Sequence, residues 1–190
     1  MSKPKIDNQY PIIEPIANRW SPRAFSDKEV PKKELMSLFE AARWAASCFN
    51  EQPWRFKVGL KGEELYDKIF DTLGEFNKNW VKTAPVVVLV KAKKTFTKNC
   101  KSNAHYWYDT GQAVSSLSIQ ANSMGIYLHQ MAGFDKKKAD AEIVNNDDFD
   151  AICVIALGYR GDIDQLPDDL AEKEYDKQIR KPLDEIVSFV

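Results

Sequence analysis

The stretch PVVVLVKAK, residues 85–93, gives the clearest indication of the fold class of this chain. Valine or leucine fills every position from 86 to 90, so no polar residue alternates with them. A strand with one face in solvent shows such alternation, whereas a continuous apolar run is typical of a central strand buried on both faces. We therefore expect a sheet that is covered on both sides and has this strand in its middle.

Further strands and helices are expected on either side of this run. The stretches 54–60 and 149–161 are predicted to be strands. Apolar residues at three- and four-residue spacing predict helices at 29–47 (with Leu35, Leu38, Phe39, Ala42 and Ala46 on the buried face), at 62–80 (interrupted at Gly74) and at 108–125. Residues 1–18 are predicted to be an extended N-terminal arm. Residues 162–190 are predicted to be a polar C-terminal extension, strand-like at its tip, that packs on a partner subunit.

Composition and charge narrow the class of protein. The 190 residues suit a single domain, 1–190, and 44% hydrophobic with 29% charged residues are typical of a soluble globular protein. A net charge of −1 gives no overall field that attracts nucleic acid. No apolar run approaches the ~18 residues of a membrane span, and residues 1–20 lack the apolar region of a signal peptide. The cytoplasm is the expected compartment.

The spacing of cysteine, histidine and glycine excludes several common sites. The three cysteines, Cys48, Cys100 and Cys153, are far apart in the sequence, and no two of them form a C-x-x-C motif. A disulfide framework is therefore not expected. His105 and His129 show no metal-binding spacing, so we expect no metal site. The chain lacks G-x-G-x-x-G and P-loop motifs, and an anionic ligand would therefore have to be held by side chains.

The helix expected at 108–125 is unusually small-sided, with Gly111, Ala113, Ser115, Ser116 and Ser118 along it. Small side chains let a neighbouring helix approach closely. Two interpretations stay open: a central helix that is buried or lies at a subunit interface, and an ordinary, tightly packed core helix.

Two arginines and a serine alternate in the segment RWSPR, residues 19–23. If the segment is extended, Arg19, Ser21 and Arg23 face one side. Guanidinium groups bind phosphate or carboxylate oxygens in bidentate fashion and do not lose their charge at neutral pH. The segment therefore indicates either an anion site or a solvated polar edge with ordinary ion pairs.

Hydrogen-bonding side chains gather in AASCFNEQPW, residues 45–54, where Ser47, Asn50 and Gln52 precede Pro53-Trp54. Each amide offers a donor and an acceptor in one plane, which suits the edge of a planar heterocycle. The alternative is an Asx turn at a helix end.

Two shorter motifs follow the long helix. In HQMAGFD, residues 129–135, Gly133 removes a side chain from a turn, so that backbone N–H groups there can approach a ligand closely. In IRKPLDE, residues 179–185, Arg180 and Lys181 form a basic pair. Alone, the turn is weak evidence for a ligand site, and a basic pair near a C-terminus is usually solvated surface.

Taken in this order, the motifs resemble the nitroreductase family of flavoenzymes over residues 17–187. The shared pattern is R-x-S-x-R, A-x-x-A-x-S-x-x-N-x-Q-P-W, D-x-G-x-A at Asp109, Gly111 and Ala113, a G-F-D turn, G-Y at a strand end and a late R-K-P. The resemblance implies an α+β fold with a mixed, largely antiparallel sheet flanked by helices. It also implies an intertwined homodimer in which the extension 162–190 wraps around the partner.

The resemblance further implies a bound FMN. Arg19 and Ser21 would meet its phosphate and ribityl chain, Arg23 the pyrimidine edge of its ring, and Arg180 with Lys181 would close the phosphate site. The backbone around Met131 to Gly133 would lie by ring nitrogen N5, and Ser47, Cys48 and Asn50 would come from the other subunit. The predicted cofactor site comprises Arg19, Trp20, Ser21, Arg23, Ala46, Ser47, Cys48, Asn50, Gln130, Met131, Ala132, Gly133, Arg180 and Lys181.

Arg23 has an electrostatic role in this assignment. Reduced FMN carries negative charge over N1 and O2, so a fixed cation beside that edge stabilises the reduced form over the neutral oxidised ring. At ~4 Å and an effective dielectric constant of ~20, one such pair is worth ~4 kcal/mol before desolvation.

Some positions depart from the family pattern. Ala46 and Arg160 stand where the family commonly has proline. A lysine often found near the flavin, just before the strand at 85–93, has no clear counterpart. Asn77 and Lys78 are the candidates for its role because they lie in that region.

The implied activity is that of an FMN-dependent oxidoreductase. NAD(P)H would reduce the flavin and leave before a nitroaromatic, a quinone or a similar electron-poor acceptor binds, which is a ping-pong mechanism. The flavin carries the chemistry, so no catalytic side chain is expected. Three alternatives stay open: a flavin reductase or a reductive dehalogenase of the same family, and a non-redox module that binds another phosphorylated ligand.

Overall fold

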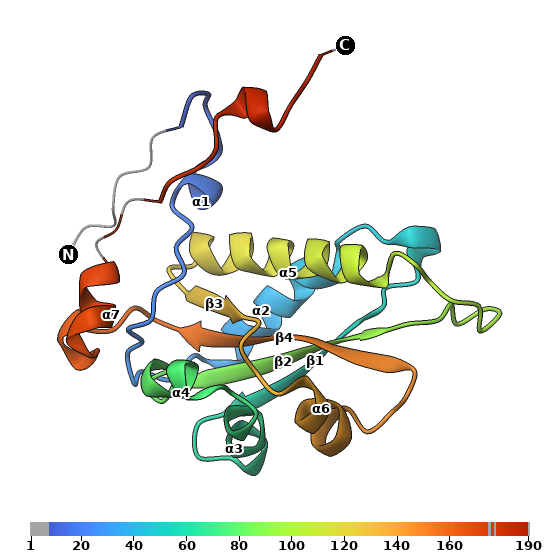
Figure 1. Cartoon of the computed structure of the whole chain (residues 1–190), viewed down its shortest axis with the longest axis horizontal. Coiled ribbons are helices and arrows are strands. Elements are labelled where there is room, and N and C mark those ends of the chain that lie inside the picture. Colours follow the sequence, from blue (N-terminus) through green and yellow to red (C-terminus); the bar gives the residue numbers. More distant parts are fainter. Residues whose placement is uncertain (1–7, 175, 177, 190) are drawn as a thin grey trace.

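The valine-rich run forms β2 (Val86–Lys93), an inner strand of a four-stranded sheet (Figure 1). The computed structural model describes residues 8–174, 176 and 178–189. β2 pairs with β1 (Trp54–Leu60) and β4 (Phe149–Gly158), and β4 pairs in turn with β3 (Tyr127–Met131). All of these pairings are antiparallel, and the strand order is β1-β2-β4-β3. The expected α+β class with a largely antiparallel sheet is confirmed.

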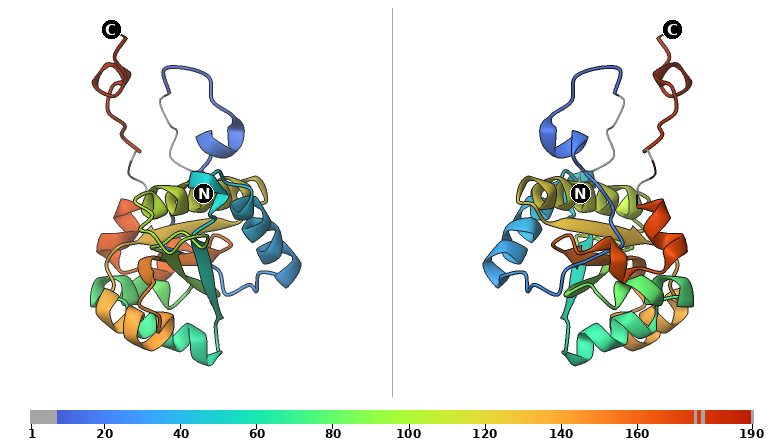
Figure 2. Two further views of the ribbon diagram at one scale, coloured as in Figure 1. Left: turned by 90° about the vertical axis from the view of Figure 1, so that its right-hand side faces the viewer. Right: turned by 90° about the vertical axis from the view of Figure 1, so that its left-hand side faces the viewer.

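Helices cover both faces of the sheet and make three layers (Figures 1 and 2). One face carries α2 (Lys32–Arg43) and α5 (Tyr106–Ser123). The other carries α3 (Glu64–Asp71), α4 (Glu75–Val81), α6 (Lys136–Ala139) and α7 (Asp168–Lys173). The remaining turns are α1 (Glu14–Ala17), η1 (Cys48–Asn50), η2 (Asp140–Val144), η3 (Ile163–Gln165) and η4 (Leu183–Glu185). In the described part of the chain, no helix has the length and apolar character needed to cross a membrane.

Alternate side chains of β2 enter two separate hydrophobic clusters. Val86, Val88 and Val90 pack on the α2–α5 side, while Val87 and Leu89 pack on the α3–α4 side. All of them are buried. The run tolerates no polar member because each face of the strand is covered by helices.

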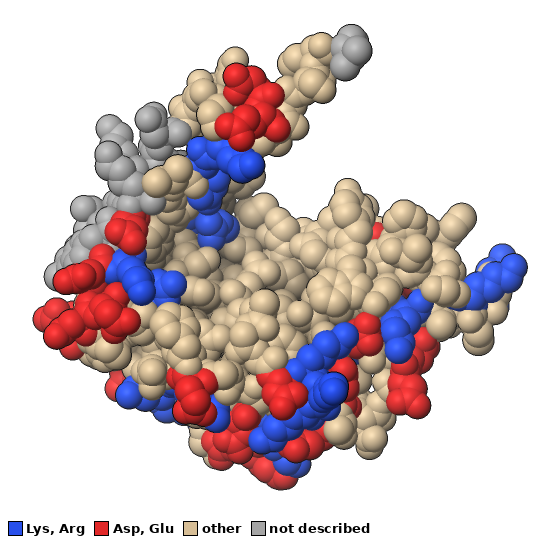
Figure 3. All heavy atoms as spheres, viewed as in Figure 1, with Lys and Arg blue, Asp and Glu red and all other residues tan. Residues whose placement is uncertain are grey.

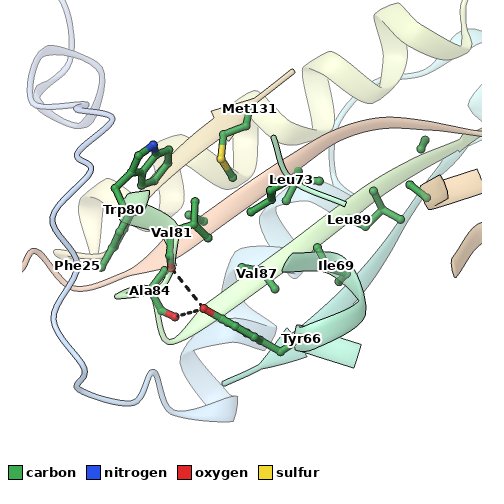
Figure 4. Packing of buried hydrophobic residues seen from close by; sticks show 14 of the residues in the cluster. Phe25, Tyr66, Ile69, Leu73, Trp80, Val81, Ala84, Val87, Leu89 and Met131 are labelled. Atoms are coloured by element: carbon green, nitrogen blue, oxygen red, sulfur yellow. Dashed lines mark hydrogen bonds between the residues drawn. The ribbon is translucent and has the colours of Figure 1, made fainter. Parts of the chain in front are cut away.

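The cluster on the α3–α4 side includes a buried phenol (Figure 4). The hydroxyl of Tyr66 donates to the carbonyl oxygens of Val81, at 3.3 Å, and Ala84, at 2.9 Å. Burial raises the pKa of Tyr66 to about 12, so the hydroxyl stays protonated at neutral pH. These bonds tie α3 to the point where the chain leaves α4 and enters β2.

The predicted helices are present, but one is shorter than expected. The stretch 62–80 divides at Gly74, which is the N-cap of α4, as predicted. α2 ends at Arg43, so the prediction of a helix to residue 47 is wrong, and Ala46 is exposed instead of buried. Trp44 is the C-cap of α2, and Ser47 Oγ accepts from the Gln52 backbone N–H in the turn that follows instead of lying in the helix.

The strand β3 is absent from the sequence-based expectations, which place a turn over 129–135. The strand continues to Met131 and the turn begins only after it, so this prediction is wrong for residues 129–131. β3 is short and lies at the edge of the sheet. Its adjacent polar residues His129 and Gln130 interrupt the alternation of apolar and polar residues that predicts a strand. Its pairing with β4 decides its conformation.

The N-terminal and C-terminal segments both project beyond the three layers on the side of α5 (Figures 1 and 2). The N-terminal arm is not extended throughout, because α1 interrupts it at 14–17, and that expectation is wrong there. Residues 1–7 of the arm lie outside the described residues.

The C-terminal extension divides into two parts. Residues 163–174 pack on the core of their own chain through Ile163, Leu166 and Leu170. Residues 179–189 are exposed, and their expected strand-like tip is not found, because a 3₁₀ turn forms at 183–185 and no strand follows up to 189. Packing on a partner stays a prediction for this second part.

Candidate functional site

The arginine segment 19–23 lies against the edge strand β3. The ring nitrogen Nδ1 of His129 is 3.1 Å from the carbonyl oxygen of Pro22. Trp20 and Pro22 are buried, whereas Arg19, Ser21 and Arg23 keep some exposure. The alternation predicted for this segment is therefore present. The guanidinium groups of Arg19 and Arg23 have different partners, however. The segment therefore takes part in two neighbouring groups of side chains, one around Arg19 and one around Arg23.

The first feature is a pair of arginines from opposite ends of the chain. Arg19 donates from Nη1 to Ser21 Oγ at 3.0 Å and from Nη2 to Gln178 Oε1 at 3.4 Å. Arg180 donates from Nη2 to the same Gln178 oxygen at 3.1 Å. Gln178 returns a bond from Nε2 to the Arg19 carbonyl at 3.2 Å.

These two arginines have no carboxylate partner among the described residues, 8–174, 176 and 178–189. Burial, and after it the positive charge of Arg180, lowers the pKa of Arg19. Both effects oppose a charged Arg19, so an anion bound between the two guanidinium groups would relieve them.

A cavity of about 350 Å³ opens beside Arg19. It runs along the outer face of α5, and most of the residues that line it are small or apolar. Its lining residues are Ile16, Arg19, Gly111, Ser115, Ser118, Ile119 and Gln130. Arg19 and Gln130, both members of the predicted site, are thus brought to one hollow.

The second feature is a carboxylate that sequence reasoning did not identify. Glu174 directly follows α7, and its side chain has no exposed surface. Its oxygens accept from the Trp20 indole at 3.3 Å, from the Arg23 backbone N–H at 3.1 Å and from Arg23 Nη1 at 3.4 Å. The stretch AEKEYDKQ (171–178) reads as polar surface, so its sequence carries no signal of a buried acid.

His129 contacts the arginine segment 19–23 and is neutral at pH 7. Burial lowers its pKa to about 4, against smaller opposing effects of the backbone hydrogen bonds. Its ring centroid lies 4.6 Å from that of Trp80 on α4. The imidazole therefore joins α4, β3 and the arginine segment without adding charge at neutral pH.

The loop after β3 is held by an amide side chain. Gly133 accepts at its carbonyl from the Gly74 N–H at 3.0 Å and from Asn77 Nδ2 at 2.9 Å. A Cβ at residue 133 would lie 2.8 Å from Asn77 Nδ2, so glycine allows this approach. Ala132 and Gly133 are exposed, whereas Met131 belongs to the core. Asn77 thus positions this loop.

The amide-rich loop of the predicted site lies elsewhere in the chain. The Cys48 N–H donates to the buried Asp109 Oδ2 at 3.0 Å, near the start of α5. Gln52 donates from its backbone to Ser47 Oγ at 3.0 Å and from its side chain to Asn50 Oδ1 at 3.2 Å. Part of the hydrogen-bonding capacity of Ser47, Asn50 and Gln52 is therefore used within the loop.

This loop and the arginine segment sit at opposite ends of α5. Near the end of the helix, Asn122 Nδ2 donates to the carbonyl of Asn18 at 3.0 Å. Asp109 and Asn122 are thirteen positions apart, which corresponds to about 20 Å along a helix. One chain therefore does not bring Ser47, Cys48 or Asn50 to Arg19.

Two predicted basic residues have local carboxylate partners. Lys181 is exposed and lies 3.6 Å from Glu185. Lys78 pairs with Glu75 at 3.0 Å. Within the described ranges, no group of three or more His, Cys, Asp or Glu is placed to bind a metal ion.

Comparisons with known proteins find a matching family model, similar sequences and similar structures. The sequence model of the nitroreductase family matches residues 16–78. A Stutzerimonas stutzeri protein named "Putative NADH dehydrogenase/NAD(P)H nitroreductase" is 29% identical over 172 residues, which cover 81% of this chain and 87% of that protein. A crystal structure described as an oxidoreductase containing FMN is 33% identical with a TM-score of 0.90, covering 99% of this chain and 96% of that one. A nitroreductase family protein of Clostridium difficile 630, 24% identical with a TM-score of 0.72 over 95% and 98% of the two chains, shares the fold.

Proposed function

Since this chain belongs to the nitroreductase family, we propose that it is an oxidoreductase that binds FMN and uses NAD(P)H to reduce electron-poor acceptors such as nitroaromatics or quinones. The observation that carries the proposal is the pair Arg19 and Arg180, which share one amide oxygen and have no carboxylate partner among the described residues. Such a pair fits a phosphate dianion, because each guanidinium can give it charge-assisted, bidentate bonds.

The remaining groups around this pair fit a flavin. Arg23 Nε is buried and has no hydrogen-bond partner among the described residues, so a donor is left for a ligand acceptor. Gln130 lines the cavity beside Arg19, and the exposed backbone at Ala132 and Gly133 follows the same strand. Arg19, Ser21 and Arg180 would hold the phosphate, Arg23 the pyrimidine edge, and residues 130–133 the side of N5.

When bound, FMN would supply the redox chemistry by taking electrons from NAD(P)H and passing them to the acceptor. The chain contributes orientation and fixed charge. Arg23 cannot lose its charge at neutral pH and therefore offers the ring edge a permanent cation. His129 stays neutral under the segment, so the number of positive charges at the site does not change around pH 7. We propose that both substrates use one face of the ring in turn, in ping-pong order.

We further propose that a second copy of this chain completes the site. Ser47, Cys48 and Asn50 lie at the far end of α5 from Arg19, so a two-fold arrangement could bring them to the partner's arginine segment. The outer face of α5 exposes Gly111 and Ser115, and small residues allow close helix approach.

The surface above α5 supports this arrangement. Figure 3 shows a hollow between the terminal segments and the body, with a floor of mostly uncharged side chains. The terminal segments beside it expose large apolar side chains, which are Ile12, Ile13, Ile16, Ile179, Leu183, Ile186, Val187 and Phe189. An exposed apolar surface of this kind marks an interaction site.

The test of the proposal is flavin binding by the full chain and by Arg19→Ala. The wild type, purified with excess FMN, should show the flavin absorption bands and oxidise NADH or NADPH only when an acceptor is present, with parallel double-reciprocal lines. Loss of one charge-assisted contact costs about 1.5–3 kcal/mol, so Arg19→Ala should weaken FMN binding about 10- to 100-fold.

Arg43→Ala is the matched control for this test. Arg43 pairs with Glu40 on the exposed side of α2, so FMN affinity should not change. A colourless wild type, or an Arg19→Ala variant with wild-type FMN affinity, would overturn the proposal. Intersecting kinetic lines would overturn the ping-pong order alone.

A further inference from the structure

Glu174 is the most deeply buried charged side chain next to the proposed flavin site. Only 1% of the residue is exposed, and it receives three donors from the segment Trp20 to Arg23. A carboxylate is costly to bury unless charge and hydrogen bonds compensate it. Glu174 is therefore held where it is by the arginine segment.

The position of Glu174 is also fixed from its own side of the chain. It directly follows α7, and Leu170 on that helix is buried in the core together with Ile163 and Leu166. The carboxylate thus approaches the arginine segment from a rigid support. Because Oε1 accepts from both the backbone and the side chain of Arg23, it fixes the direction in which that side chain leaves the backbone.

The Arg23–Glu174 pair is open on one side. The side chain of Arg23 is 24% exposed and that of Glu174 is fully buried. Arg23 Nε makes no hydrogen bond with the described residues, so Glu174 does not use the whole guanidinium. A ligand beside Arg23 would therefore meet a cation whose field is partly cancelled from behind.

We propose that Glu174 is a positioning residue that orients Arg23 and offsets its charge, and thereby lowers the reduction potential of the bound flavin. This inference rests on the proposed function. The reduced flavin carries more negative charge at its pyrimidine edge than the oxidised flavin does. A buried negative charge behind Arg23 therefore destabilises the reduced form relative to the oxidised form.

The decisive variant is Glu174→Gln, which keeps the shape and an acceptor oxygen but removes the charge. The midpoint potential of bound FMN and the affinity for oxidised FMN are measured together with the thermal midpoint of unfolding. The ratio of the affinities for reduced and oxidised FMN should rise about tenfold, which corresponds to a potential higher by about 30 mV for a two-electron couple. Glu174→Asp keeps the charge and should stay nearer the wild-type potential.

Glu172→Gln is the matched control, because Glu172 lies on the same helix but is exposed. Its potential should equal that of the wild type. A folded Glu174→Gln variant that binds FMN with an unchanged potential would overturn the inference and leave the proposed function intact. A shift of equal size in Glu174→Asp would also overturn it, since the charge would then not be the cause.

If Glu174→Gln does not fold, a second pair of variants tests the same proposal. Arg23→Gln leaves Glu174 as an uncompensated anion and should lower the affinity ratio for reduced over oxidised FMN by about tenfold, about 30 mV. Adding Glu174→Gln in that background removes the anion and should restore most of the ratio. Equal potentials in the single and double variants would contradict the proposal. A wild type that binds no FMN would overturn the proposed function, and this inference with it.

Discussion

His129 shows how one side chain at this site couples stability to pH. It contacts the carbonyl of Pro22 and the ring of Trp80, and its burial favours the neutral imidazole. In the unfolded chain the same residue titrates near its ordinary pKa. The unfolded state therefore binds more protons than the folded state between these two pKa values, and stability falls as pH falls through that window.

The substitution His129→Gln should remove the contribution of this side chain to the pH dependence of stability. The wild type should lose stability between pH 6.5 and about 4, and full protonation of His129 would cost about 3 kcal/mol. His129→Gln should lack this part of the pH dependence, while His105→Gln, at an exposed position, should retain it. Denaturant unfolding at pH 7, 5.5 and 4.5 measures the difference. Identical pH profiles for the wild type and His129→Gln would contradict this account.

At the scale of elements, the contact between β1 and α3 depends on a glycine. A Cβ at Gly59 would lie 2.5 Å from the Cα and 2.6 Å from the backbone nitrogen of Tyr66. Both are backbone atoms, so no side-chain rotation relieves the overlap. α3 can lie this close to the strand only because residue 59 has no side chain.

Gly59→Ala should therefore destabilise the fold by about 1–3 kcal/mol, the usual cost of overpacking. Gly74→Ala is the comparison, because a Cβ there would lie 3.5 Å from the Gly133 carbonyl oxygen, an ordinary contact. Its cost should be clearly smaller. Thermal or denaturant unfolding of both variants measures the difference, and a Gly59→Ala variant as stable as Gly74→Ala would show that α3 can shift at no cost.

At the scale of the whole molecule, α5 separates the two halves of the predicted site. Its two ends hold the η1 loop and the arginine segment, and its exposed middle carries small residues. The terminal segments lie on the same side of the sheet as α5 (Figures 1 and 2). They expose large apolar side chains. A two-fold pairing over α5 would cover this surface and join the two halves.

Ser115→Arg tests this pairing. An unpaired charge in the middle of the interface costs several kcal/mol, so dimerisation should weaken by more than about a hundredfold and FMN binding should weaken with it. Asp71→Arg, on α3 in the opposite layer, should stay dimeric. Sedimentation and flavin titration of both variants measure the effect. A Ser115→Arg variant that remains a flavin-bound dimer would contradict the arrangement.

Local patterns predicted many elements but not all of them. The apolar run of β2 and the spacing of α3 and α4 around Gly74 are properties of neighbouring residues, and both predictions are confirmed. Local patterns do not predict β3, because an edge strand of five residues with polar members depends on pairing with β4. The apolar spacing predicts the end of α2 four residues too late, because Ala46 continues the spacing of the buried face past the end of the helix at Arg43.

For the candidate site, residue types and local spacing are enough to predict the chemical groups: arginines in alternation, an amide-rich loop and a late basic pair. Which of these groups meet depends on the folded chain. Gln178 joins Arg19 to Arg180, although it is 159 positions away from Arg19 in the chain. Glu174 lies behind Arg23, from which it is 151 positions away. The physical reason is that residue type and local spacing set what a side chain can bind. Which groups share a buried volume depends instead on the packing of α7, β3 and the terminal segments around one sheet.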